Sequence, residues 1–189
     1  MLRTEAYIIL QKIGNRAERA AGVATSMLVS GCRSMDAELR RLRGDAGDEL
    51  LRLSLGVASS PFAVGEAVAT VRLGTELCRV LDGAAETAVL LRGRALRAWS
   101  PFDRVRTTAT LTTALSAVVG LLGKCSEHDM HASLGAFCEE SGRLARLTER
   151  SYEGIVATDE CTATLALAAA LDRWRDAIDD AYGFAVGLL

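Results

Sequence analysis

The amino-acid sequence predicts an all-α protein. Half of its 189 residues are hydrophobic, yet only 5% are aromatic. Ala and Leu recur throughout, and both are strong helix formers whose side chains suit closely packed helices. Pro, which interrupts helices, occurs only at Pro61 and Pro101, so long stretches are free to be helical. A chain of this length can also bury a sizeable core.

Three helices are predicted before Pro101. In the first, apolar residues recur at spacings of three and four, and Ser30 with the Gly after it is typical of a helix end. The second carries a leucine stripe that Gly44 and Gly47 weaken in the middle. Ser60 followed by Pro61 indicates the start of the third. The predicted ranges are Glu5–Val29, Ser34–Leu55 and Ser60–Trp99.

The second half of the chain repeats this order. Pro101 biases the preceding residue away from helical geometry, so residues 100–103 are a predicted linker. Further helices are predicted over Arg104–Cys125, Asp129–Glu153 and Asp159–Leu189. An ungapped superposition of the third helix on the sixth places Asp82 on Asp179. We therefore expect two tandem three-helix bundles of up-down helices, over residues 1–99 and 104–189.

Composition narrows the class of protein. The net charge of −2 gives no strong field that would attract nucleic acid. Five cysteines without a C-x-x-C pair form neither a disulfide framework nor a zinc ribbon. No signal peptide is visible, and the most apolar stretch, Thr162–Leu171, is shorter than the ~20 residues that span a bilayer. We expect a cytoplasmic protein with reduced cysteines and no transmembrane segment.

One stretch resembles a known family. A turn at 55–61 leads into small and aliphatic residues and then into an acidic pattern. This resembles the third helix of a repeat in the PhoU family of phosphate-uptake regulators, whose signature is D-L-E-R-I-G-D-x-A-x-N-I-A. The matching residues are Glu76, Leu77, Arg79, Val80, Asp82, Ala84 and Ala88, and in the second half Asp179, Ala181 and Ala185. The family's two three-helix repeats agree with the six helices predicted from the pattern.

The resemblance also implies a metal site. The family has a Glu four residues before an Asp, which places both carboxylates on one helix face, and it is associated with metal clusters there. The candidate ligands, a weak set for a divalent or iron ion, are Glu76, Asp82, Asp176, Asp179 and Asp180. However, the Glu position is Cys78 in the first half and Arg175 in the second. An Arg there opposes a cation, so no cofactor is firmly predicted.

Other candidate sites have simpler interpretations. Asp176, Asp179 and Asp180 share a helix face and could hold a cation, but neighbouring arginines favour a solvated surface. His128 and His131 could chelate a transition metal, but their position at a predicted helix start favours capping. Cys78 is interpreted as a small buried residue.

The expected function is binding and not catalysis. No nucleotide-binding loop or nucleophile motif is present, and both histidines lie in one short cluster, so no catalytic residues are predicted. The resemblance implies a regulator of phosphate uptake and signalling that contacts a phosphate ABC transporter and a sensor histidine kinase. The alternatives are a helical adaptor or oligomeric structural protein, and a metal-binding bundle. An apolar helix face left open would also allow a homodimer.

Overall fold

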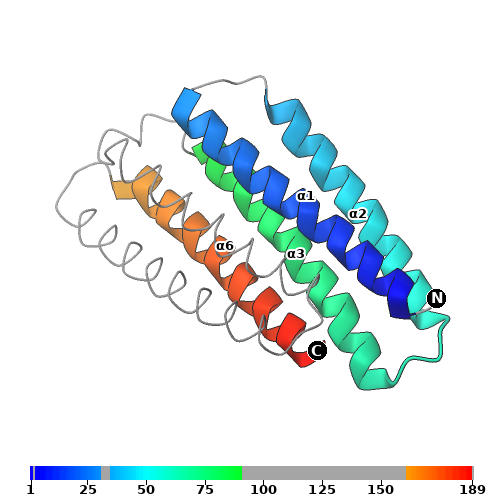
Figure 1. Cartoon of the computed structure of the whole chain (residues 1–189). Helices are drawn as coiled ribbons and strands as arrows, with labels where there is room; N and C mark the ends of the chain where they lie inside the picture. The colour runs from blue at the N-terminus through cyan, green and yellow to red at the C-terminus, as the bar shows by residue number, and fades with distance from the viewer. Residues whose placement is uncertain (2, 31–34, 91–160, 189) are drawn as a thin grey trace, which may run out of the picture.

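The described part of the protein is a bundle of long helices (Figure 1). A computed structural model describes residues 1, 3–30, 35–90 and 161–188. The helices are α1 (Arg3–Ser30), α2 (Asp36–Ala58), α3 (Val64–Leu90) and α6 (Cys161–Leu188). The described ranges contain no strand, which confirms the all-α class for this part. The linker and the predicted fourth and fifth helices lie outside the described residues, so the tandem repeat stays a prediction.

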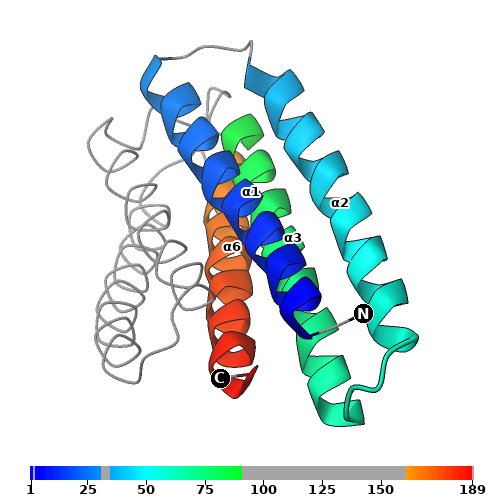
Figure 2. The same cartoon turned by 45° about the vertical axis from the view of Figure 1, so that its right-hand side comes forward.

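Helix α3 lies at the centre of this bundle. It packs against α1, α2 and α6, and α2 packs mainly against α1 and α3. In both views α1 and α3 run in the same direction, α2 and α6 run opposite to them, and α2 lies on the side away from α6 (Figures 1 and 2). The helix that carries the PhoU-like residues is therefore the most enclosed, while one face of α2 lies at the outside of the bundle.

The apolar periodicity of α1 produces its buried face. Ile9, Ile13 and Ala17 are at most 2% exposed, and the row continues through Ala20, Ala21 and Ala24. Residues at these spacings lie on one side of a helix. Small alanine side chains let neighbouring helices approach closely. The prediction of a first helix is confirmed, and α1 extends two residues beyond the predicted range at the start and one at the end.

Helix α2 continues through Gly44 and Gly47. Ala46, between Gly44 and Gly47, is buried, while both glycines are exposed. A glycine lowers helix propensity by about 1 kcal/mol relative to Ala, a cost that burial of the same helix turn can offset. Leu42 and Leu53 are buried on either side of this segment. Packing therefore keeps intact a helix that the sequence alone makes weak in the middle.

The turn between α2 and α3 differs from the prediction. The Ser60-Pro61 pair was expected to begin the third helix, but α3 begins at Val64. The Ser59 hydroxyl donates to the carbonyl of Leu55 at 2.9 Å, and the Ser60 hydroxyl donates to the carbonyl of Gly56. Both serines therefore satisfy carbonyls at the end of α2 instead of capping the start of α3.

The core between α3 and α6 is aliphatic. Leu73, Leu77 and Leu81 of α3 are at most 1% exposed, and Ala177 and Ile178 of α6 are equally buried. All five belong to one hydrophobic cluster that also includes residues of α1 and α2. Apolar burial on this scale is the main stabilising term in a helical bundle. None of the four described helices combines the length and hydropathy that a membrane span needs.

Candidate functional site

The acidic residues of the PhoU-like stretch are held by arginines. Glu76 accepts a hydrogen bond from Arg79 at 2.7 Å, one turn along α3. Asp82 accepts one from Arg43 of α2 at 2.6 Å. The Glu76 side chain is 12% exposed and the Asp82 side chain 57%. The two carboxylates therefore have different partners and different surroundings.

The acidic residues of α6 are placed in the same way. Asp176 forms an ion pair with Arg175 at 2.9 Å, and Asp180 lies 3.8 Å from Arg79 of α3. Asp179 is half-buried and also takes part in a polar interaction. Arg79 thus lies between an acid of α3 and an acid of α6 and links the two helices. These contacts are typical of charged residues at the edge of an interface between two helices.

The candidate metal ligands do not converge in the described part of the chain. Within the described ranges, no three Asp, Glu, Cys or His side chains lie together as a group that could hold a metal ion. Each guanidinium next to a carboxylate offsets the negative charge that a cation would need. His128 and His131 lie outside the described residues.

A groove runs between α2 and α3 beside Cys78. The residues that line it enclose a depression of about 320 Å³. The lining residues are Arg43, Gly44, Ala46, Gly47, Leu50, Cys78, Leu81 and Asp82. The Arg43–Asp82 ion pair closes one side, and the two glycines leave room above α2, since nothing lies within 4 Å of a Cβ placed on either. The groove combines an apolar floor with one charged pair.

Partial burial raises the pKa of the Cys78 thiol. Desolvation, followed by the negative charge of Asp82, raises the pKa of Cys78 to about 11. The thiol lies 3.8 Å from the carbonyl oxygen of Ala46, to which it donates. Because the thiolate is the nucleophile and the metal ligand, a thiol with a raised pKa is poorly suited to either role. The interpretation of Cys78 as a small packing residue agrees with this environment.

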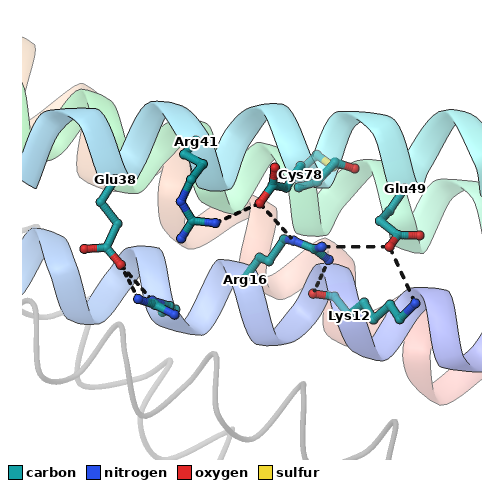
Figure 3. A network of polar contacts seen from close by, with 9 residues as sticks. Lys12, Arg16, Glu38, Arg41, Glu49 and Cys78 are labelled. Carbon is teal, nitrogen blue, oxygen red and sulfur yellow. Dashed lines mark hydrogen bonds and ion pairs between the residues drawn. The ribbon is translucent and has the colours of Figure 1, made fainter.

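A network of polar contacts joins α1 and α2 (Figure 3). Arg19 donates to Glu38 at 2.8 Å. Lys12 and Arg16 approach Glu49 at 3.7 and 3.8 Å. The sequence analysis singled out none of these pairs, although α1 and α2 carry opposite charges on facing rows. Exposed pairs of this kind are each worth under about 1 kcal/mol, so their main effect is to fix the register of the two helices.

Glu49 is the most enclosed member of this network. Its side chain is 15% exposed. Its Oε2 atom is buried and has no hydrogen-bond partner among the described residues. A carboxylate oxygen in this state weakens the local structure, and the nearby cations Lys12 and Arg16 offset part of that cost. Lys12 and Arg16 of α1 therefore balance the charge of Glu49 of α2 at this contact.

Exposed apolar side chains gather on α2 and α3. Leu51 and Leu55 of α2 are 60% and 64% exposed, and Val64 and Val68 at the start of α3 are also exposed. The two leucines lie one turn apart on one helix face, as do the two valines. Apolar side chains that form a contiguous exposed patch mark surfaces that bind another protein, and the two leucines can contribute to such a patch.

Comparison of the chain with protein-family models, curated proteins and solved structures found no match.

Proposed function

We propose that the protein is a PhoU-like regulator of phosphate uptake and phosphate-responsive signalling, which acts by binding other proteins and not by catalysis. The observation that carries the proposal is the position of α3. The PhoU-like residues Leu77, Val80, Ala84 and Ala88 are all buried on it, and this helix contacts the three other described helices. The resemblance therefore falls on the residues that organise the bundle.

The packing of α3 against α6 supports the proposed internal duplication. In the superposition that places Asp82 on Asp179, Val80 falls on Ala177, Leu81 on Ile178 and Ala84 on Ala181. All six of these apolar residues are buried. Helices at equivalent positions of two repeats would then pack side by side, with each repeat supplying one helix to the central interface.

The ion pairs support a regulator that works without metal. Asp82, the acid retained from the family's Glu–Asp pair in the first half, is paired with Arg43. Its neighbour Cys78 stands in place of the second acid and has a raised pKa. The regulator would act through a protein surface, and its proposed partners are the phosphate ABC transporter, contacted on the cytoplasmic side, and a sensor histidine kinase.

Binding to the proposed partners is the direct test. The full chain would be immobilised and exposed to the purified ATPase subunit of the phosphate transporter and to the cytoplasmic part of the sensor kinase. The proposal predicts saturable binding to at least one of them. Binding to neither would reject it, provided that the immobilised chain keeps its helical circular dichroism spectrum.

A helical adaptor with no phosphate role is the second candidate. The exposed apolar side chains of Leu51 and Leu55 favour it, since they require only a protein partner of some kind. An adaptor would leave phosphate uptake unchanged when its gene is deleted, and the PhoU-like regulator would not. The two candidates therefore differ in one measurable phenotype.

A further inference from the structure

We propose that the outer face of α2 is a self-association surface, on which a second copy of this chain docks with its own α2 running antiparallel. The outer face of α2 comprises Gly44, Gly47, Asp48, Leu51, Arg52 and Leu55, all of them exposed. Their spacings of three and four place them on one side of the helix. The inference goes beyond the proposed function and holds with or without a phosphate role.

The apolar part of this face combines exposed leucines with glycines that have open space beside them. Leu51 and Leu55 are 60% and 64% exposed, although leucine is among the most often buried residues. One and two turns before them, Gly44 and Gly47 leave open space, with nothing within 4 Å of a Cβ placed on either. The same helix therefore carries two protruding side chains and two gaps.

Two charged residues on this face have no partner among the described residues. Asp48 and Arg52 lie one turn apart beside the leucines, and within the described part of the chain neither takes part in an ion pair or a hydrogen bond. Other arginines in the neighbourhood behave differently, since Arg41 pairs with Asp45 and Arg43 with Asp82. One unpaired acid and one unpaired base thus remain on the same exposed surface.

A second copy fits this pattern because the surface is complementary to itself. In a two-fold arrangement each copy presents the same patch to the other. With the two α2 helices antiparallel, Asp48 of each copy faces Arg52 of the other, so the ion pair forms twice. The leucine row of one copy then lies over the glycine gaps of the other. A single helix pair buries less than a standard interface of about 800 Å² per partner, so we expect a dissociation constant in the micromolar range.

Sedimentation velocity on charge-reversed variants tests the pairing. The unmodified chain should show a monomer–dimer equilibrium with a dissociation constant of about 10 µM. Asp48→Arg places Arg against Arg twice, and Arg52→Asp places Asp against Asp twice, so each variant should associate at least about tenfold more weakly. An equimolar mixture of the two variants places Arg against Asp twice and should dimerise about as well as the unmodified chain.

A matched pair of apolar variants tests the leucine row. Leu51→Glu should abolish the dimer. Val89, near the end of α3, is as exposed as Leu51, at 60%. Because Val89 lies outside the outer face of α2, Val89→Glu should leave the dimer intact. Circular dichroism confirms that each variant is folded. The inference is overturned if the chain is monomeric at every concentration, if Leu51→Glu still dimerises, or if the charge-reversed variants show no gain on mixing.

Discussion

At Gly74, α3 packs closely against side chains of α2. A Cβ placed on it would lie 3.0 Å from Leu50 Cδ1 and 3.0 Å from Leu53 Cδ2. Because Leu53 is fully buried, it has little room to move. We expect Gly74→Val to lower the free energy of unfolding by about 1–3 kcal/mol through overpacking. Urea denaturation measures this change.

Gly22 of α1 provides the control for that experiment. Nothing lies within 4 Å of a Cβ placed on this residue. Gly22→Ala should therefore raise the free energy of unfolding, by up to about 1 kcal/mol, because Ala has the higher helix propensity. If Gly74→Val were as stable as the unmodified chain, the close packing of α2 on α3 would be wrong.

Cys78 makes stability depend on pH in the alkaline range. Burial raises its pKa from 9.0 to about 11 in the folded protein. Between these values the unfolded thiol has lost its proton and the folded one has kept it, so the contribution is complete below about pH 9 and is lost as the pH rises towards about 11. The midpoint of urea denaturation should therefore fall more between pH 8.5 and 10.5 in the unmodified chain than in Cys78→Ser. An equal fall of the midpoint in both proteins would contradict the raised pKa of Cys78.

A substitution at Asp179 tests whether this residue helps to bind a metal ion. It takes part in a polar interaction within the described bundle, and no metal-binding group of three ligands lies near it in the described ranges. We expect purified protein to carry no stoichiometric metal and Asp179→Ala to leave its metal content unchanged. Elemental analysis by mass spectrometry decides the question. A stoichiometric ion that is lost in Asp179→Ala would favour the metal-binding bundle.

At the scale of helices, α3 and α2 should differ in their response to truncated leucines. Leu77 of α3 is fully buried, and Leu51 of α2 is 60% exposed. Leu77→Ala should destabilise the protein by about 2–5 kcal/mol because it leaves a cavity. Leu51→Ala should change the stability of the monomer by at most about 0.5 kcal/mol. Thermal unfolding at low protein concentration compares the two, and similar losses would contradict the central position of α3.

Helix positions could be predicted where the apolar periodicity was long. The pattern that includes Ile9, Ile13 and Ala17 predicted the first helix to within two residues at either end. The start of α3 could not be predicted, because Ser60-Pro61 fits a helix start as well as a turn. The choice depends on the hydroxyl contacts that the serines make with the end of α2, which are properties of the folded turn.

The candidate site could also be predicted only in part. The sequence identified Cys78 as a departure from the family's metal-binding pattern and Asp82 as an acid that is retained, and the surroundings of Cys78 fit the first interpretation. The partner of Asp82 could not be predicted, because Arg43 lies 39 residues earlier and reaches it only through the antiparallel packing of α2 on α3. The pairs between α1 and α2 were missed because the sequence does not specify the register of two facing helices.

At the scale of the whole molecule, the described bundle has a buried centre and an exposed outer face on α2. Its centre consists of α3 and the apolar faces packed on it, and these residues are buried. Its outer side consists of α2, which carries exposed leucines together with Asp48 and Arg52. Changes to the outer face should therefore alter association without unfolding the protein, which is the arrangement that a regulator acting through protein contacts requires.

The rate of phosphate uptake in a strain that lacks the gene is the decisive test of the proposed regulatory role. Cells would be grown with abundant phosphate, and uptake of radiolabelled phosphate would be compared with that of the parent strain and of a strain in which the gene is restored. If the protein is a PhoU-like regulator, uptake stays high in the deletion strain and is again repressed after complementation. Uptake that remains as low in the deletion strain as in the parent would contradict the proposed regulatory role.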